Sequence, residues 1–288
     1  MNLPDLSIAD VVQPAWNVSP RVRALVTTRD GGVSLPPFGR WRDDADLPGG
    51  LNLGMKAGDD PAAVAANRAR LLNVAGVEEA AWLEQIHGAG IVRAEDVLAQ
   101  LHATGAPTSA DASIADRPGV VCVVMVADCM PVLFCDAAGR AVGAAHAGWR
   151  GLAAGIVERT AQRVAGLAGV EPCELHAYLG PSIGPTAFEV GADVRDAFMN
   201  DAGNVDDAQR DATARAFVGH PDNEGKYLAD LPALARLRLQ RLGVTRVTGG
   251  DLCTVTLRER FYSYRRDRET GRMAALIWID DRAQTIAD

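Results

Sequence analysis

An α/β (α+β) layered sandwich with mixed β-sheets, in a single domain, is the fold class that the sequence predicts. Predicted strands and helices alternate in only some parts of the chain, and several predicted strands follow one another near its centre. This order favours a mixed sheet over a doubly wound parallel sheet. No internal repeat or long linker divides the 288 residues, of which 48% are hydrophobic and 23% charged. We therefore expect an N-terminal arm over 1–20 and one domain over 21–288.

In the first part of the chain, apolar runs bounded by Gly, Pro and Asp predict the elements. Asp60 and Pro61 begin a helix, because Asp caps a helix N-terminus and Pro is favoured in the first turn. We expect strands at 23–28, 82–86 and 91–94, a helix from 61 to about 73, a turn at 30–34 and loops at 36–48 and 95–118.

Buried strands and amphipathic helices are expected in the rest of the chain. Gly243 ends the last of these helices, because glycine accepts the left-handed conformation that follows a helix C-terminus. The polar, Asp-rich segment 200–223 lacks a clear pattern, so we expect it to be a surface insertion. The predicted strands are 120–127, 132–135, 141–145, 175–179, 244–247 and 273–279, and the predicted helices are 152–167, 189–199 and 228–242.

The charge balance and the cysteine pattern limit the classes of function. A formal net charge of −8 argues against a nucleic acid or an anionic membrane as partner, because both repel an acidic surface. The N-terminus has no basic segment followed by an apolar one, and the apolar runs are far shorter than the ~20 residues of a membrane helix. Five scattered cysteines do not indicate a disulfide framework. We expect a cytoplasmic protein that is a monomer or a weak homo-oligomer.

Three side chains with metal-binding chemistry, His87, Cys129 and His146, each follow an apolar run and stand beside Gly or Pro. A thiolate and two imidazoles suit zinc and leave a fourth tetrahedral position open for catalysis, although the spacing matches no compact zinc motif. The same residues also allow a nucleophilic interpretation, in which Cys129 attacks, His146 is its base and His87 orients the substrate or binds an oxyanion. A third interpretation makes Cys129 a buried structural thiol.

Arginines beside predicted turns indicate a site for an anion. Arg150 follows a glycine-containing turn and begins a predicted helix, where backbone N–H groups attract negative charge. Surface ion pairs are the alternative explanation for every arginine in this group. The candidate phosphate ligands are Arg68, Arg150, Ser263, Arg265 and Arg266, and Arg272 belongs to the same basic group.

Uncharged and acidic polar side chains also stand at or near the ends of predicted strands. Asn52, Gln85 and Asp111 are candidate substrate ligands, and Asp128, directly before Cys129, is the candidate catalytic carboxylate. Each of the four has a structural alternative, since such side chains often cap turns or bond buried backbone groups.

Seven motifs follow one another along the chain. They are Asn52-Leu53-Gly54, Gln85-Ile86-His87-Gly88, Ala110-Asp111-Ala112, Ala127-Asp128-Cys129-Met130-Pro131, His146-Ala147-Gly148-Trp149-Arg150-Gly151, Leu179-Gly180-Pro181-Ser182-Ile183-Gly184 and Tyr262-Ser263-Tyr264-Arg265-Arg266-Asp267. In this order they resemble the laccase-domain family, also called the multicopper polyphenol oxidase or peptidoglycan editing factor family. The resemblance extends from about residue 21 to 280, and its central block, 127–151, is highly specific to that family.

The resemblance implies a metal site at His87, Cys129 and His146 that holds zinc or, in some descriptions, copper. It implies phosphorolysis of adenosine, inosine and methylthioadenosine to a free base and a ribose 1-phosphate sugar, with adenosine deamination as a side activity. Purine nucleosides and phosphate are then the small-molecule partners. The implied fold is similar to the catalytic domain of a cytotoxic necrotising factor, a layered sandwich with a Cys-His pair.

These implied reactions give the candidate residues roles. Arg150, Arg265 and Arg266 would hold phosphate, while Asp128 or the metal would serve the departing base. Asp111 or Asp128 would act as the acid-base group in deamination. Two other activities stay open: a Cys-His hydrolase that edits peptidoglycan precursors, and a copper-dependent polyphenol oxidase, for which five histidines are few.

Overall fold

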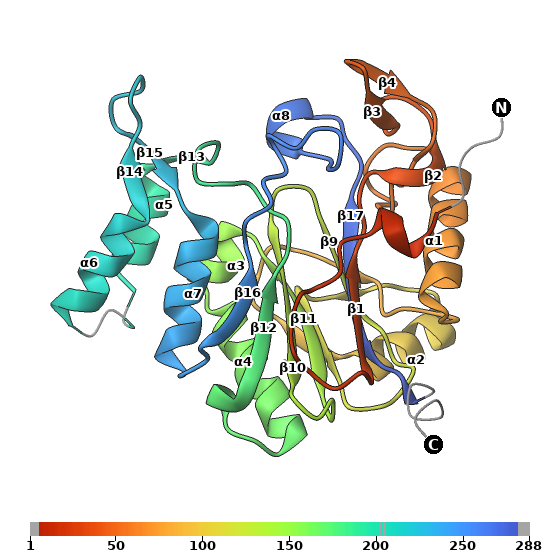
Figure 1. Ribbon diagram of the computed structural model, residues 1–288, viewed down its shortest axis with the longest axis horizontal. Helices are drawn as coiled ribbons and strands as arrows, with labels where there is room; N and C mark the ends of the chain where they lie inside the picture. The colour runs from red at the N-terminus through yellow and green to blue at the C-terminus, as the bar shows by residue number, and fades with distance from the viewer. Residues whose placement is uncertain (1–5, 202, 204–205, 282–288) are drawn as a thin grey trace.

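A six-stranded mixed sheet lies at the centre of the computed structural model, which describes residues 6–201, 203 and 206–281 (Figure 1). The neighbouring strands β12, β10, β11 and β8 are antiparallel, whereas the edge strands β16 and β6 are parallel to their neighbours. This arrangement confirms the predicted mixed sheet. The order is β16 (Arg246–Gly249), β12 (Leu175–Leu179), β10 (Met130–Asp136), β11 (Val142–Ala147), β8 (Ala112–Ala115) and β6 (Ile91–Arg93).

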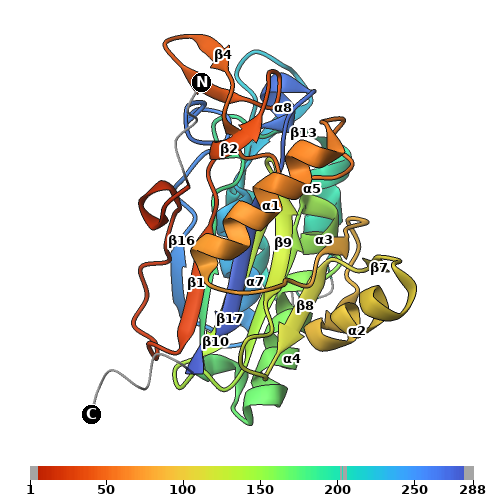
Figure 2. The same ribbon diagram turned by 90° about the vertical axis from the view of Figure 1, so that its right-hand side faces the viewer.

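A second, antiparallel sheet packs face to face on the first, and helices cover both outer faces (Figures 1 and 2). Leu133 of the first sheet and Ile277 of the second lie in the core between them. Leu71 of α1 packs on the outside of the second sheet, and Val164 of α4 belongs to the core on the outside of the first. The layers form one mixed α/β domain, whose further elements are β1 (Val22–Val26), β17 (Met273–Ile279), β9 (Cys122–Val126), α1 (Pro61–Ala75), α4 (Ile156–Ala168) and α7 (Leu231–Arg241).

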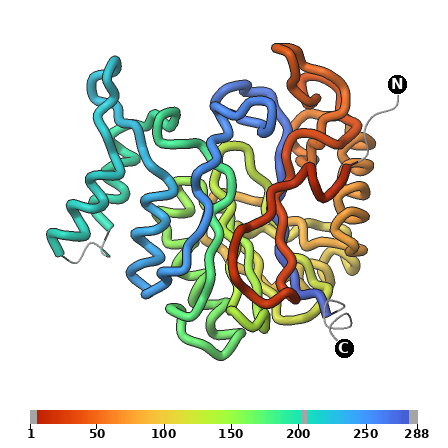
Figure 3. Tube along the Cα trace, in the orientation of Figure 1, coloured from red at the N-terminus to blue at the C-terminus, as the bar shows by residue number. Residues whose placement is uncertain are grey.

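A smaller three-stranded sheet with two helices projects from one side of these layers (left in Figures 1 and 3). It consists of β13 (Glu189–Gly191), β15 (Lys226–Ala229), β14 (Phe217–Gly219), α5 (Ala192–Met199) and α6 (Asp207–Arg215). The described part of the segment 200–223 therefore contains a helix and a strand. Helix α6 is a polar surface helix, capped by Asp206 and burying only Thr213 among its described residues, which explains the weak pattern of the segment. That the segment is an insertion stays a prediction.

The prediction of a loop over 95–118 is wrong, because this segment contains most of helix α2 (Ala94–Thr104) and the strands β7 (Thr108–Ser109) and β8. Helix α2 buries only Ala94, Val97 and Leu98, so its apolar stripe is short and easily overlooked. Gly105, in the left-handed conformation at φ 68°, ends the helix.

Other boundaries shift by a few residues where two elements follow each other directly. The predicted helices 189–199 and 228–242 each begin with a short strand, β13 or β15, and the predicted helix 152–167 is divided into α3 (Trp149–Ala153) and α4. Gly155, at φ 83°, separates α3 from α4. The turn at 30–34 and the loop at 36–48 contain β2 (Asp30–Ser34), β3 (Arg40–Arg42) and β4 (Ala45–Leu47).

Both predicted helix caps are confirmed. The Asp60 side chain accepts a hydrogen bond from the backbone N–H of Ala62 at the start of α1, with Pro61 in the first turn. Gly243 follows α7 at φ 73°.

None of the helices in the described part of the chain has the length and apolar character needed to cross a membrane.

Candidate active site

The chain crosses from one sheet to the other at Asp128 and Cys129, since β9 belongs to the three-stranded sheet and β10 to the six-stranded sheet. Asp128 makes this crossing with a left-handed backbone, at φ 91°. Strands β10 and β11, near the predicted strands 132–135 and 141–145, form a hairpin that pairs Pro131 with His146, so His146 lies across from the start of β10. The hairpin thus brings the imidazole of His146 to the thiol of Cys129.

His87 reaches the same place from a loop that follows β5 (Leu83–Glu84). Its backbone is left-handed at φ 60°, a conformation that costs a non-glycine residue free energy and often marks a functional position. The rings of His87 and His146 meet edge to face with 4.8 Å between their centroids. One ligand atom each from His87, Cys129 and His146 lies within 4.8 Å of the others.

Gly148 leaves room for the thiol of Cys129 and the ring of His87 to come close together. A Cβ atom at this position would lie 2.8 Å from the Sγ of Cys129 and 3.5 Å from a ring carbon of His87. The first distance is shorter than a van der Waals contact, so an alanine here would displace the thiol. Steric contact with the predicted ligand Cys129 therefore explains why glycine stands at position 148.

The two histidines change the acidity of the thiol. Burial alone would raise the pKa of Cys129, but the charges and hydrogen bonds of His146 and His87 outweigh it and lower the pKa to about 6. Burial likewise would lower the pKa of His146, whereas the Cys129 thiolate and the Asp111 carboxylate raise it to about 9. In the metal-free protein, both shifts favour a thiolate on Cys129 beside an imidazolium on His146.

This donor set fits a zinc-type metal. One thiolate and two imidazoles are typical ligands of zinc and of copper, and the side chains come together without another protein ligand in the described residues. A fourth position facing the cavity would then be available to substrate or water.

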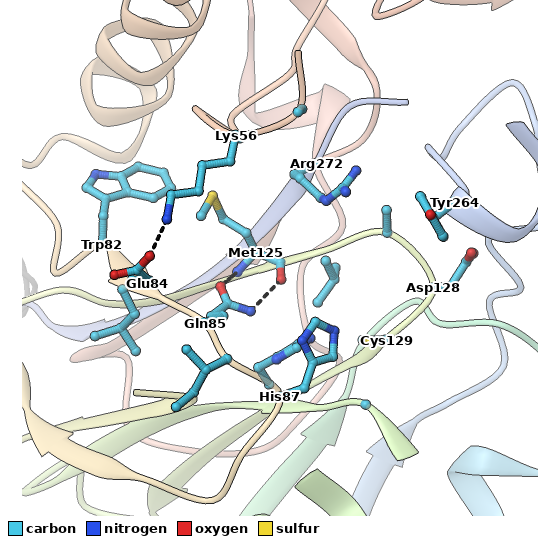
Figure 4. A pocket seen from close by; sticks show the side chains of 18 of the residues that line it. Lys56, Trp82, Glu84, Gln85, His87, Met125, Asp128, Cys129, Tyr264 and Arg272 are labelled. Carbon is cyan, nitrogen blue, oxygen red and sulfur yellow. Dashed lines mark hydrogen bonds and ion pairs between the residues drawn. The ribbon is translucent and has the colours of Figure 1, made fainter. Parts of the chain in front are cut away.

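A cavity of about 1090 Å³ opens above these three residues (Figure 4). Its wall includes eight of the residues predicted from the sequence: Arg68, Gln85, His87, Asp128, Cys129, His146, Arg150 and Arg265.

Four predicted residues do not line this cavity: Asn52, Asp111, Ser263 and Arg266. The side chain of Asn52 accepts the backbone N–H of Gly54 and that of Arg272, and donates to a neighbouring carboxylate. Ser263 caps the short helix α8 (Tyr264–Asp267) by accepting the N–H of Arg266. The guanidinium of Arg266 donates to three backbone carbonyls and to Asp267, which leaves it no role at the cavity wall.

Asp111 is fully buried behind the histidines rather than in the cavity. Its carboxylate accepts the Nδ1–H of His146 at 2.9 Å and the backbone N–H groups of Ile86, His87 and Gly88 at 3.3, 2.9 and 2.6 Å. Burial alone would raise the pKa of Asp111, but these hydrogen bonds lower it. A carboxylate surrounded by four donors is poorly suited to proton transfer with a substrate.

Two of the lining residues use their polar atoms on the protein itself. The amide of Gln85 donates to the carbonyl of Met125 at 2.8 Å and accepts the N–H of Met125 at 2.7 Å (Figure 4). The carboxylate of Asp128 accepts the hydroxyl of Thr254 and the backbone N–H of Arg265, each at 2.6 Å. Both side chains therefore shape the wall and fix neighbouring segments.

The arginines of the wall are held in different ways. The Nη1 of Arg265 donates to the carbonyl of Glu189 at 2.9 Å. Arg68 lies over the ring of Trp82 at 3.9 Å, and burial lowers its pKa to about 10. Arg150 packs beside the ring of Trp149 and is exposed.

Sequence reasoning did not select several residues of this wall as site residues: Lys56, Trp82, Glu84, Met125 and Tyr264. Arg272, which the sequence places in the basic group without a role as a ligand, also lines the wall. It directly precedes β17, whose first residue, Met273, pairs with Val126 at the end of β9, three residues before Cys129. Its Nη1 donates to the carbonyls of Thr270 and Gly271, which directs the side chain beside the cavity.

Comparison with known proteins agrees with these features. The family model for the multi-copper polyphenol oxidoreductase laccase matches residues 23–280. Purine nucleoside phosphorylase YfiH of Shigella flexneri is 46% identical over 273 residues, which cover 94% of this chain and 100% of the relative. A purine nucleoside phosphorylase of Pseudomonas aeruginosa is 46% identical over 268 residues, covering 93% and 98%.

Solved structures agree as well. A crystal structure of a Neisseria meningitidis protein has a TM-score of 0.80 and 46% identity, and covers 94% of this chain and 99% of its own. A hypothetical protein, YfiH, from Bacillus licheniformis has a TM-score of 0.79 and 30% identity, covering 94% and 97%. The chain therefore belongs to the multi-copper polyphenol oxidoreductase laccase family.

Proposed function

We propose that this protein is a purine nucleoside phosphorylase that uses a zinc ion held by His87, Cys129 and His146. The observation that carries the proposal is this three-ligand cluster beside a large cavity whose wall bears arginines, in a chain of net charge −8. Relatives that are 46% identical are named for this activity. Residues 21–288 would act as one catalytic domain.

The two sides of the cavity suit the two substrates. Trp82 and Met125 lie on one side of His87, and Arg272 and Tyr264 lie on the other (Figure 4). Aromatic and thioether surfaces favour a purine ring, whereas guanidinium groups favour phosphate. We assign the nucleoside base to the Trp82 side, and the phosphate to Arg272 and Arg265, with Arg150 at the exposed rim.

In the proposed reaction, a phosphate oxygen forms a bond to the anomeric carbon of the ribose while the bond from that carbon to the base nitrogen breaks. The electron pair leaves with the base, which then takes a proton. Zinc held by His87, Cys129 and His146 would supply Lewis acidity. The chain itself orients phosphate through the arginines and shields the reacting atoms from bulk water, because positioning and fixed charges lower the barrier of such transfers.

Adenosine deamination, use of methylthioadenosine and replacement of zinc by copper belong to this proposal as finer points. Deamination needs an acid-base carboxylate, and Asp128 is the candidate because it lines the cavity. The similarity of fold to a cytotoxic necrotising factor stays a prediction. Copper-dependent phenol oxidation is a weaker proposal, since it would depend on a single three-ligand cluster in the described residues.

A Cys-His hydrolase is the second candidate function. It is favoured by one observation: Cys129 has a lowered pKa, and His146 stands between this thiol and the carboxylate of Asp111. This order of thiolate, imidazole and carboxylate is the one that nucleophilic cysteine enzymes use.

The test separates the two candidates. The purified protein is stripped with a chelator, reloaded with zinc, and incubated with inosine or adenosine in the presence and absence of phosphate. We expect base and ribose 1-phosphate only when zinc and phosphate are both present. Base release without phosphate would refute phosphorolysis, and a covalent substrate adduct on Cys129 would establish the hydrolase instead.

A further inference from the structure

The carboxylate of Asp111 contacts both histidines of the cluster, but in two different ways. Its Oδ1 accepts the ring Nδ1–H of His146 and the backbone N–H of His87, each at 2.9 Å. Its Oδ2 accepts the backbone N–H groups of Ile86 and Gly88, at 3.3 and 2.6 Å. The ring of one histidine and the backbone around the other are thus bound to one acidic group.

Asp111 itself is rigidly placed between these two segments. Its backbone N–H donates to the carbonyl of Gly90 at 3.1 Å, and its carbonyl accepts the N–H of His146 at 2.7 Å. The side chain is fully buried, so water does not compete for its oxygens. The loop that carries His87 wraps around this carboxylate with His87 in the left-handed conformation.

We propose that Asp111 is a positioning residue that directs Nε2 of His146 and the loop of His87 toward Cys129, and so assembles the ligand set. An acceptor at Nδ1 fixes the tautomer of the ring, which leaves the lone pair of Nε2 for the metal. Without the carboxylate, the left-handed conformation of His87 has no compensating hydrogen bond. This inference rests on the proposed metal site, although the geometry also orients both histidines toward a metal-free thiol.

The isosteric variant Asp111→Asn tests the proposal, because an amide fails in either of its orientations. With its NH₂ group at the Oδ1 position, it faces the Nδ1–H of His146 and forces the proton onto Nε2. With the NH₂ group at the Oδ2 position, it faces the N–H groups of Ile86 and Gly88 and repels the loop. Each orientation therefore displaces one of the two histidines.

Asp136 provides a matched control at the far end of the same hairpin. It is also a buried carboxylate with a lowered pKa, and it accepts the backbone N–H groups of Ala138, Arg140 and Ala141 at 3.2, 2.6 and 3.0 Å. It holds a turn but contacts no histidine of the cluster. The variant Asp136→Asn should lose a similar number of backbone hydrogen bonds without affecting the cluster.

The first measurement is a titration of the metal-free protein with cobalt(II), followed by the thiolate-to-cobalt absorption band. We expect Asp111→Asn to bind cobalt about 10- to 100-fold more weakly than the wild type, with an altered band, and Asp136→Asn to match the wild type. Equal cobalt affinity and an unchanged band in Asp111→Asn would overturn the proposal.

The second measurement needs no metal and no turnover. In ¹⁵N-labelled metal-free protein, the Nδ1–H proton of His146 should give a downfield signal that exchanges slowly with solvent. In Asp111→Asn this signal should be lost when the NH₂ group faces His146, or move upfield when the amide oxygen faces it, because a neutral amide is a weaker acceptor than a carboxylate. A signal that persists unchanged in the variant would refute the role of Asp111. A wild type that takes up no cobalt would refute the metal site, and the imidazole signal would then decide alone. If the amide variant does not fold, Asp111→Ser takes its place in both measurements.

Discussion

The two ends of the β10–β11 hairpin carry the same kinds of residue but differ in chemistry. At one end, His146 of β11 lies between the thiol of Cys129 and the buried carboxylate of Asp111, and the ring of His87 packs against that of His146. The other end has Cys135 beside the buried carboxylate of Asp136 and no histidine of the cluster. Only the first end faces the cavity.

The difference shows that burial by itself does not make a reactive thiol. Burial raises the pKa of Cys135, and the negative charge of Asp136 raises it further. Cys129 is subject to the same penalty, yet His146 and His87 lower its pKa to about 6. Positively charged hydrogen-bonding partners, rather than depth in the protein, therefore decide where a thiolate forms.

Removing each of the two thiols is the strongest test of this comparison. We expect Cys129→Ala to reduce kcat/KM for inosine phosphorolysis by at least about 1000-fold, which corresponds to about 4 kcal/mol of transition-state stabilisation. Cys135→Ala should keep its activity and lose about 1 kcal/mol of unfolding free energy through the small cavity it leaves. Steady-state kinetics and urea unfolding measure the two effects. Comparable activity losses in both variants would abolish the distinction between the ends.

Two glycines sharpen the comparison. Gly148→Ala places a Cβ 2.8 Å from the Sγ of Cys129, so zinc affinity should fall about 10- to 100-fold, an effect expected when a ligand is displaced. Gly143→Ala, near the start of β11, places a Cβ 2.7 Å from Val164 and should cost about 1–3 kcal/mol of stability by overpacking. Chelator competition and thermal unfolding separate the two results. Unchanged zinc affinity in Gly148→Ala would contradict the steric account of this glycine.

The pH dependence of alkylation gives the smallest of the expected effects. Because the pKa of Cys129 is lowered to about 6, its thiolate is present above that pH and is lost as the pH falls through it. In the metal-free native protein, the rate of Cys129 alkylation should fall about tenfold between pH 7 and pH 5, whereas Cys135 should not react. Mass spectrometry of iodoacetamide-treated samples follows both sites. A Cys129 rate that still rises steeply from pH 7 to pH 8 would show that the histidines do not stabilise the thiolate.

The sequence identifies the three-residue cluster because each member lies within two residues of Gly or Pro and follows a run rich in apolar residues. It cannot distinguish Arg265 from its neighbour Arg266. Their backbone positions on a short helix send one guanidinium to the cavity wall and the other to backbone carbonyls. It also cannot show that the four donors around Asp111 are brought together from two distant segments. These assignments depend on tertiary contacts rather than on residue type.

The mixed sheet and most strands are also predictable, since buried strands appear as continuous apolar runs. Helix α2 is not, because its short apolar stripe lies among polar and small residues and gains stability from packing rather than from its pattern. Short strands such as β13 and β15 escape prediction for the same reason, since each is defined by its partner strand and not by its own sequence.

The crossing of the chain between the two sheets at Asp128 and Cys129 has a consequence for how the site is organised. The thiol lies where the sheets meet, and the histidines come from a loop and from the opposite strand of the hairpin. An ion that binds all three side chains would cross-link separate segments of the chain. Folding has already brought these segments together, so the chain needs little further ordering when the ion binds. The binding free energy therefore contains only a small loss of conformational entropy.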